Sequence, residues 1–370
     1  MDLELTDDQQ LYLETTVRFI ESELPVARTR ALHDDPRGYD EKWLRKTAEL
    51  GWFAMLVPEE HGGGSVSGHG ILDAAIVAEA LGRYVQPGPF IPMNVVAAAI
   101  AEHGTSEQQA SILPGIVAGE VVVTWAPLDV DGQWDLGRGL VAEVDGDEVV
   151  LTGVRGFVQD AQSADHLLVT ASCDGEPLQL LVPAGAAHIT PLTCLDLTRR
   201  MAEVTFDHAR VPSATRLASD VRDALERQEQ VAVALCCAET IGALDTMFSM
   251  TVAYSKDRVA FGRPIGSFQS LKHVMADVSY YLECCKAAAV EAARAVDSRS
   301  SDAAEVTTMA ASYIAEHATE IAQQSLQVHG GIGYTWEHDL HLYMRRTRTN
   351  STLYGEPALH RERLCEVHGL

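Results

Sequence analysis

Helical spacing of apolar residues dominates the first third of the chain. One such run extends from Leu13 to Leu24 and ends at a proline, and Thr6 with Gln9 before it forms the pattern of a capping box. Similar spacing recurs over residues 43–50, 71–81 and 93–103. The pattern predicts an N-terminal helical domain over residues 1–120.

The periodicity changes near residue 121. Short runs rich in β-branched and apolar residues occupy positions 141–144, 149–151, 167–170, 178–182 and 202–206. The pairs Asp145-Gly146 and Asp174-Gly175 lie between such runs and favour tight hairpin turns. We therefore expect a small antiparallel sheet or barrel as a second domain over residues 121–220.

Helical patterns return in the last part of the chain. Alanine-rich stretches cover residues 221–256, 268–296 and 303–328. Long helices with many small residues usually pack as a bundle, often against another copy. The expected fold class is α+β, mainly α: an N-terminal helical domain, a middle β-domain, and a C-terminal helical bundle over residues 221–370.

The chain is strongly acidic. Its 370 residues include 28 Lys and Arg against 53 Asp and Glu, which gives a net charge of −25. This charge argues against nucleic acid or an anionic membrane as a partner, because both would repel it. We expect no apolar run long enough to span a bilayer, and the N-terminus lacks the basic and apolar regions of a targeting peptide. The sequence thus favours a cytoplasmic protein with no nucleic-acid or membrane partner.

The cysteines support the same compartment. Seven are present, and they include the adjacent pairs Cys236-Cys237 and Cys284-Cys285 inside helical patterns. Neighbouring residues on a helix point in different directions, so these pairs indicate buried small side chains in a reducing compartment. No Cys or His spacing typical of zinc occurs, and we expect no metal site.

Two segments near the C-terminus indicate the chemistry. Residues 258–269 read Arg-Val-Ala-Phe-Gly-Arg-Pro-Ile-Gly-Ser-Phe-Gln, and residues 327–335 read Gln-Val-His-Gly-Gly-Ile-Gly-Tyr-Thr. Together they resemble the two signature segments of the acyl-CoA dehydrogenase family, whose members use FAD to desaturate acyl-CoA thioesters between Cα and Cβ. The resemblance covers essentially the whole chain. It implies the architecture of that family, in which each FAD lies across a subunit boundary.

The resemblance implies that one surface of this chain holds the ADP end of FAD. The residues that match the family there are Arg258, Phe261, Gln269, Gln327, Gly330 and Gly331. A guanidinium is a fixed fork suited to pyrophosphate oxygens, and glycine lets backbone N–H groups approach phosphate closely. Phe261 would pack near the adenosine and dimethylbenzene parts, and Gln269 would line the cofactor. This half of the flavin site matches the family.

The half that should hold the flavin ring departs from the family pattern. The family's Glu-Pro-Gly-Ala-Gly-Ser-Asp loop should follow residues 121–124, where this chain reads Trp-Ala-Pro-Leu-Asp-Val-Asp-Gly. Phe157 replaces the Trp that stacks on the ring, and Gln159 replaces the Thr that bonds near flavin N5. Phenylalanine can still stack, but Gln adds bulk beside the reactive atom. These changes indicate a degraded ring site, with a divergent yet working ring site as the alternative.

Desaturation also needs a carboxylate that removes the α-proton. In register with the family's C-terminal Glu this chain has Gly355, or Tyr354 if a one-residue gap follows Arg345. Glu356 lies one or two positions late, and one extended residue moves a side chain by about 3 Å and reverses its direction. Glu356 is therefore a weak candidate for the catalytic base.

The family's other position for the base is on the helix before the first segment. At the two positions known for that base, this chain has Val259, which directly follows Arg258, and Ser249 or Met250, and none of them is a base. Glu239 lies further upstream on the same helix. We expect it to cap a polar pocket or an interface, and it is the second weak candidate. The sequence otherwise assigns no catalytic residue.

These observations lead to one main hypothesis and two alternatives. Segments 261–273 and 354–363 look most like bacterial family members that form heterotetramers of two copies of each of two subunits, with half the usual FAD, and act on steroid side-chain CoA esters. The main hypothesis is a non-catalytic subunit that completes the FAD site of a homologous catalytic partner. The alternatives are a self-sufficient homotetramer that uses Glu356 or Glu239, and a flavin-free structural subunit. An electron-transfer flavoprotein is the acceptor that the family implies.

Overall fold

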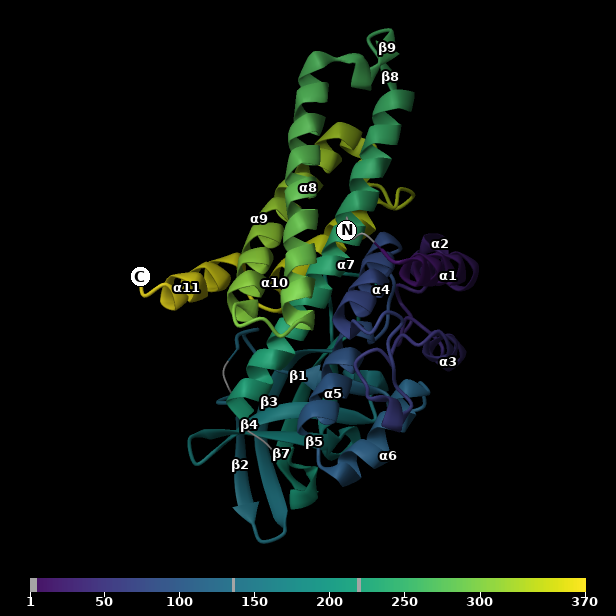
Figure 1. Ribbon diagram of the computed structural model, residues 1–370. Helices are drawn as coiled ribbons and strands as arrows, with labels where there is room; N and C mark the ends of the chain where they lie inside the picture. Colours follow the sequence, from purple (N-terminus) through teal and green to yellow (C-terminus); the bar gives the residue numbers. More distant parts are fainter. Residues whose placement is uncertain (1–4, 135–136, 218–220) are drawn as a thin grey trace.

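The computed structural model describes residues 5–134, 137–217 and 221–370. A mixed sheet forms one end of the molecule, and long helices extend from it to the opposite end (Figure 1). The expected fold class, mainly α with a middle sheet, is confirmed by the order of the elements along the chain.

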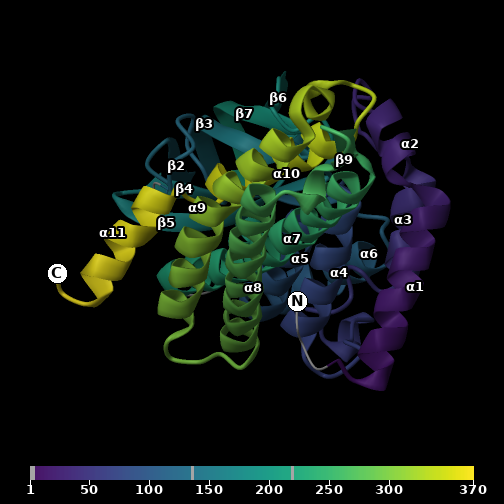
Figure 2. The ribbon, with the colours of Figure 1, turned by 90° about the horizontal axis from the view of Figure 1, so that it is seen from above.

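The N-terminal part is helical. Its helices are α1 (Asp7–Glu23), α2 (Val26–Ala31), α3 (Glu41–Glu49), α4 (Gly70–Arg83), α5 (Phe90–His103) and α6 (Ser106–Val117). Thr6 and Gln9 form the expected capping box of α1, because each side chain bonds the backbone N–H of the other. Helices α4 and α5 are almost wholly buried, and α1 and α3 lie outside them (Figure 2).

The middle part is a seven-stranded sheet. Its strands are β1 (Val123–Ala126), β2 (Leu140–Asp145), β3 (Glu148–Gln159), β4 (His166–Cys173), β5 (Glu176–Pro183), β6 (His188–Leu192) and β7 (Met201–Pro212). The order is β1-β4-β2-β3-β7-β6, and β5 pairs with β4. Most pairs are antiparallel as expected, but β1 and β2 pair with β4 in parallel. Asp174 and Gly175 both have positive φ in the β4–β5 turn, as a type I′ hairpin requires.

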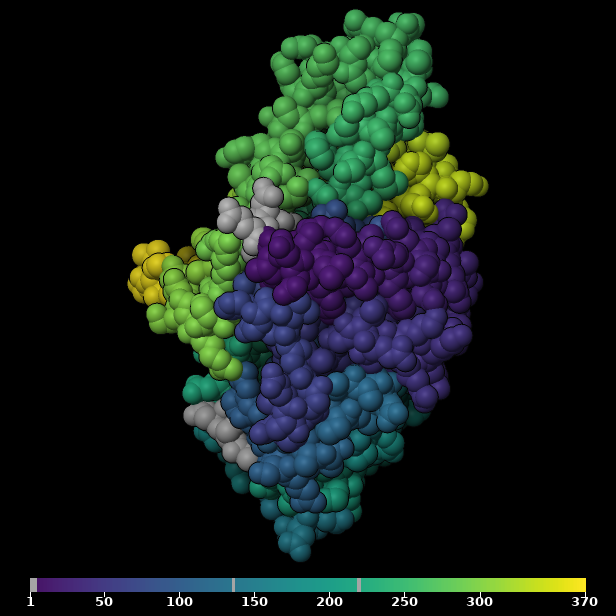
Figure 3. Space-filling model, turned by 45° about the vertical axis from the view of Figure 1, so that its right-hand side comes forward, coloured from purple at the N-terminus to yellow at the C-terminus, as the bar shows by residue number. Residues whose placement is uncertain are grey.

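The C-terminal part is a bundle with a projecting tip. Its helices are α7 (Val221–Asp257), α8 (Gln269–Asp297), α9 (Ala303–His329), α10 (Leu340–Leu353) and α11 (Pro357–Val367). A small hairpin of β8 (Val259–Ala260) and β9 (Arg263–Pro264) joins α7 to α8 at the tip. Figure 3 shows the ends of α7 and α8 projecting beyond the rest of the molecule.

Helix α7 corrects one expectation from the sequence. It contains an 18-residue window with a mean hydropathy of 1.6, so by length and composition it could cross a membrane. However, 83% of that window is buried inside the protein. Its apolar residues from Val231 to Ile241 belong to the core cluster that also contains those of α4, α5 and β1. The length and apolar character of α7 are therefore those of a central core helix.

Two glycines set how closely α4 and α7 approach. A Cβ on Gly82 would lie 1.9 Å from the carbonyl oxygen of Glu239, and a Cβ on Gly242 would lie 1.9 Å from that of Glu79. Real Cβ atoms do not approach so closely, so only glycine fits at both positions. The crossing brings the backbone of α7 at Glu239 directly against the N-terminal domain.

Candidate flavin and substrate site

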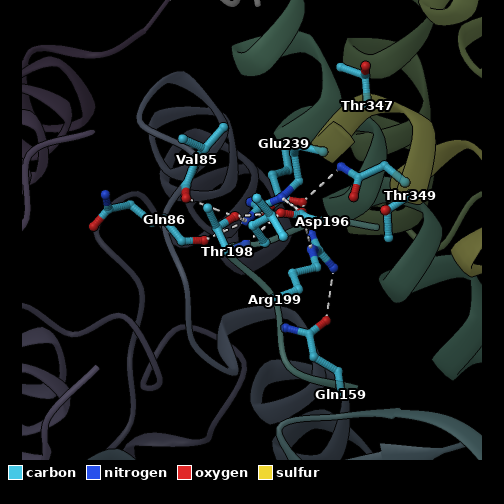
Figure 4. A network of polar contacts seen from close by, with 12 residues as sticks. Val85, Gln86, Gln159, Asp196, Thr198, Arg199, Glu239, Thr347 and Thr349 are labelled. Carbon is cyan, nitrogen blue, oxygen red and sulfur yellow. Dashed lines mark hydrogen bonds and ion pairs between the residues drawn. The ribbon is translucent and has the colours of Figure 1, made fainter. Parts of the chain in front are cut away.

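Buried charges meet where the sheet, α7 and α10 come together (Figure 4). Arg346 of α10 donates from Nε to Asp196 at 2.5 Å and from Nη1 to Glu239 at 2.8 Å. Its Nη2 bonds the hydroxyl of Thr198 at 2.6 Å and the carbonyl of Gln86 at 3.0 Å. One guanidinium thus connects the segment before β7, helix α7 and the loop after α4.

A second guanidinium extends this network to the sheet. Arg199 donates from Nη2 to Glu239 and from Nη1 to the side-chain oxygen of Gln159 at 2.9 Å. Arg346 and Arg199 hold the pKa of Asp196 below its ordinary value, although burial alone would raise it. The neighbouring Asp160 is fully buried, and burial raises its pKa to about 6. The cluster therefore contains two fixed cations, two paired carboxylates and one carboxyl that is easily protonated.

Glu239 is fully engaged in this cluster. It is 5% exposed, and its two oxygens accept from Arg346, from Arg199 and from the amide of Asn350 at 2.9 Å. Both carboxylate oxygens are therefore occupied by donors of this chain, and neither is left to face a substrate. Glu239 is thus a buried carboxylate that holds two arginines and one asparagine together. The sequence led us to expect it at a polar pocket or an interface.

A cavity of about 330 Å³ lies between the sheet and the end of α10. Its lining includes Leu128, Asp131, Phe157, Leu192, Met201, Arg348, Leu353 and Glu356. Phe157 is 43% exposed and adopts a φ of 50° at a break in the pairing of β3 with β7. The one residue that we expect to stack on a flavin ring therefore does face an open space.

Gln159 does not face that space. Its amide nitrogen donates to the carbonyl of Gly88 at 3.0 Å and to Asp160 at 3.1 Å, and its oxygen accepts from Arg199. The side chain is 6% exposed. Both amide hydrogens are used inside the protein, so Gln159 has no donor left for flavin N5. The position that holds Thr in the family has become part of the buried network.

Aromatic rings from β1 and from the loop after it pack against each other and against Tyr354. Trp125 and Trp134 pack with centroids 5.2 Å apart, and Trp125 lies 6.0 Å from Tyr354. The indole N–H of Trp134 donates to the carbonyl of Tyr354 at 3.3 Å. Asp129 accepts from the backbone N–H groups of its own turn. The indole N–H of Trp134 and the N–H groups of this turn are therefore bonded within the chain. They are not available for the contacts that the family's glycine-rich loop makes with flavin.

The positions in register with the family's C-terminal base carry no carboxylate. Tyr354 is 7% exposed, and burial raises the pKa of its phenol far above the ordinary value. Gly355 has a φ of 120° and no side chain. Glu356 is the exposed N-cap residue of α11 and is among the residues that line the 330 Å³ cavity. Among the described lining residues, Glu356 and Asp131 are the carboxylates.

The six residues expected at the ADP end of FAD all lie on the surface. Arg258, Phe261, Gln269, Gln327, Gly330 and Gly331 are exposed, and Phe261 is 94% exposed at the tip of the β8–β9 hairpin. Gly330 has φ 62° and ψ −141°, a conformation essentially confined to glycine. A Cβ on Gly330 or Gly331 would meet no atom of this chain within 4 Å.

Open glycine backbone and an exposed guanidinium are groups that fit the ADP part of FAD. The residues around Phe157 fit the ring part less well, because Gln159 and the loop after β1 bond inside the protein. The structure also brings together residues that sequence patterns did not single out. The rings of Tyr254 and His329 stack 4.6 Å apart and join the ends of α7 and α9. Both lie within one helical turn of a residue expected at the ADP surface, which is the signal that could have revealed them.

Family models match at both ends of the chain. The acyl-CoA dehydrogenase N-terminal domain matches residues 6–120, and the acyl-CoA dehydrogenase C-terminal domain matches residues 230–368. The acyl-CoA dehydrogenase IpdE2 of Mycolicibacterium smegmatis is 31% identical over 95% of this chain and 96% of that protein.

Solved structures agree with this match over the whole chain. The ChsE4-ChsE5 complex from Mycobacterium tuberculosis superposes with a TM-score of 0.91 and 25% identity over 100% of this chain and 99% of that one. A variant of the steroid acyl-CoA dehydrogenase Tcur3481-Tcur3483 superposes with a TM-score of 0.89 and 27% identity over 98% of both chains. This chain therefore belongs to the acyl-CoA dehydrogenase family, whose members are FAD-dependent oxidoreductases that act on CH–CH bonds.

Proposed function

We propose that this chain is the non-catalytic subunit of a heteromeric FAD-dependent acyl-CoA dehydrogenase. One contrast carries the proposal. Gln159 and Glu239 are bonded into the buried cluster around Arg199, whereas Arg258, Gly330 and the other ADP-surface residues face outward. Such a chain can hold the ADP end of a flavin whose ring lies in another subunit.

The reaction shows why the cluster matters. FAD, when bound, accepts the hydride that leaves Cβ of the acyl-CoA. The protein must supply a base for the α-proton, and a general base typically contributes about 10²–10⁴-fold in rate. Neither Tyr354 nor Gly355 can take that proton, and Glu239 is held by two guanidinium groups. We infer that the partner supplies the base and the ring pocket.

The relatives support a two-gene assembly and a bulky substrate. The names ChsE4-ChsE5 and Tcur3481-Tcur3483 each describe two proteins, and the second is called a steroid acyl-CoA dehydrogenase. We propose a heterotetramer of two copies of each subunit, a steroid-like acyl-CoA as substrate, and an electron-transfer flavoprotein as acceptor. The acidic charge and seven free cysteines of this chain support a cytoplasmic location for the heterotetramer.

Purification with and without a partner tests the proposal. We expect the chain alone to carry no bound flavin and to show no dehydrogenase turnover. Co-expressed with the acyl-CoA dehydrogenase gene beside its own, it should form a yellow, active complex with one FAD per two chains. A yellow, active homotetramer with one FAD per chain would overturn the proposal. Unchanged flavin content after Arg258→Ala in the complex would instead support a flavin-free structural subunit.

One observation favours a second candidate function. Glu356 lines the same cavity as Phe157, so a self-sufficient enzyme that uses Glu356 as its base has some structural support. However, Glu356 is exposed and is the N-cap residue of α11. A base misplaced by about 1 Å can lose 10²-fold in rate, which makes this the weaker of the two functions.

A further inference from the structure

The two segments of the ADP surface meet through one pair of rings. Tyr254 lies one turn before Arg258, whose backbone N–H donates to the Tyr254 carbonyl at 2.8 Å. His329 is the last residue of α9 and directly precedes Gly330. The rings of Tyr254 and His329 stack with centroids 4.6 Å apart and an interplanar angle of 20°. A flat contact of this kind fixes both the separation and the tilt of the two helix ends.

His329 is held in one orientation. It is 4% exposed, and its Nδ1 lies 2.8 Å from the carbonyl oxygen of Ser325. A carbonyl only accepts, so Nδ1 carries the proton and Nε2 is an acceptor. Nε2 is buried and has no hydrogen-bond partner in the part of the chain that the structure describes. The ring of His338 approaches edge-on at 4.8 Å and completes the packing.

An unpaired buried acceptor destabilises a fold, so an apolar side chain of similar size would stabilise this position more. Burial and the nearby His338 lower the pKa of His329, which keeps the ring neutral and able to stack. What His329 adds over an aliphatic side chain is therefore a rigid, oriented ring. That ring faces Tyr254 and lies next to the backbone that a phosphate would approach.

The hairpin that carries Arg258 needs such an anchor. Its strands have two residues each, and an isolated two-stranded hairpin is marginally stable. Within it, Arg263 lies over the ring of Phe268 at 4.1 Å, and the N–H of Ile265 donates to the carbonyl of Arg258 at 2.8 Å. These contacts order the hairpin internally. Among the described residues, the ring contact that joins the base of this hairpin to α9 is the stack of Tyr254 on His329.

We propose that Tyr254 and His329 are positioning residues for FAD. Their stack sets the distance between the segment of Arg258 and the segment of Gly330, so that both reach the ADP moiety of one cofactor. The inference rests on the proposed function, because the flavin concerned is the one shared with the partner. Neither residue touches the reacting atoms.

The test uses the co-expressed complex after its flavin has been removed. The affinity for added FAD is measured by flavin fluorescence for wild type and for Tyr254→Phe, Tyr254→Leu and His329→Leu. We expect Tyr254→Phe to bind like wild type, since the ring is kept. Tyr254→Leu and His329→Leu should each bind FAD about 10-fold more weakly, because loss of the ring contact lets the two segments that hold the ADP moiety move apart.

Two further measurements separate the outcomes. Thermal unfolding of the flavin-free complex shows whether a variant has lost its fold. We expect Tyr254→Leu to keep its melting temperature while it loses affinity, which a purely structural role would not produce. Arg258→Ala is the reference for the proposed function. If Arg258→Ala weakens FAD binding and Tyr254→Leu with His329→Leu do not, the positioning role is wrong. If Arg258→Ala has no effect, the proposed function itself fails.

Discussion

Gly82 on α4 and Gly242 on α7 each lie against the other helix's backbone, with no room for a Cβ between them. Reciprocal contact of this kind makes the crossing a fixed point between the N-terminal helices and the bundle. It also determines where the buried cluster forms, because Glu239 is one turn before Gly242 on the same helix. The positions of the cluster and of the helix crossing are thus coupled.

Gly242→Ala should destabilise the protein. In an ordinary helix interior this change stabilises by about 0.5–1 kcal/mol, but here the methyl group meets the Glu79 carbonyl. We expect a loss of about 1–3 kcal/mol in the free energy of unfolding, as for other overpacked cores. Urea denaturation checks this. Gly185→Ala is the control, since its Cβ meets nothing within 4 Å. Equal stability of both variants would show that the helices can move apart freely.

Glu239→Gln should lower the stability of the chain. The change removes the negative charge that faces both Arg199 and Arg346. Breaking a buried pair on one side typically costs about 3–5 kcal/mol. Denaturant unfolding of the isolated chain measures the loss, with Glu226→Gln, an exposed carboxylate on the same helix, as the matched control. A Glu239→Gln variant that is as stable as wild type but abolishes turnover of the complex would instead assign Glu239 as the base.

Glu356→Gln should leave turnover nearly unchanged. The side chain is an exposed helix cap without a capping hydrogen bond, so its charge does little for the fold. We expect the complex to keep its kcat within about a factor of 2, compared with the 10²–10⁴-fold loss that removal of a general base produces. Steady-state kinetics with flavin content measured in parallel decide this. A loss of that size with flavin retained would establish the self-sufficient alternative.

The two adjacent glycines of the ADP surface should respond differently to Ala. Gly330 has a φ of 62°, so Gly330→Ala introduces backbone strain of about 1–3 kcal/mol. Gly331 is not in the left-handed region and its Cβ would meet nothing in this chain. Gly331→Ala should therefore leave the stability of the chain unchanged and still reduce the FAD affinity of the complex. If neither variant changes FAD affinity, this surface does not contact the cofactor.

Stability should depend on pH through Asp160. Burial raises the pKa of this carboxyl from 3.8 to about 6, so the folded state binds its proton more tightly than the unfolded chain does. That contribution is complete below about pH 4 and is lost as the pH rises through 6, about 3 kcal/mol in all at 1.36 kcal/mol per unit. Burial lowers the pKa of His360 to about 4, which acts in the opposite direction.

The effect of Asp160 is therefore isolated by comparing variants at each pH. Relative to wild type, Asp160→Asn should gain about 2 kcal/mol in unfolding free energy between pH 4.5 and 7.5, because the amide is never ionised. Urea denaturation across this range is the measurement. Asp207→Asn, whose side chain is 97% exposed, should show a constant difference. A constant difference for Asp160→Asn as well would contradict the assigned pKa.

Sequence patterns that span only a few residues correctly predicted a helix cap and a hairpin turn. The capping box of Thr6 and Gln9 and the hairpin at Asp174-Gly175 are confirmed, since each depends on residues a few positions apart. Strand β6 was missed because its residues are mostly exposed and include Pro191, so they show no apolar alternation. The short helix α2 was missed too, because six residues give no helical period.

The candidate site depended on contacts that no local pattern contains. Asp196 and Arg346 are 150 residues apart, and no sequence pattern links them, although Arg346 Nε donates to Asp196 at 2.5 Å in the fold. Gln159 was expected to crowd the flavin, yet it turns inward because Arg199 and Gly88 offer it hydrogen bonds. The residues matched to the ADP surface remain predictions, although the structure does place all six on the exterior.

The outward position of Phe261 and its neighbours has an evolutionary consequence. Almost the whole ring of Phe261 is exposed. The folding of the chain therefore does not depend on which residue occupies that position. Substitutions at this tip would therefore not be detected by a screen for soluble expression. On the proposed function, these side chains are selected through the flavin site shared with the partner subunit, so changes at the tip should track changes in the partner's gene from one genome to the next.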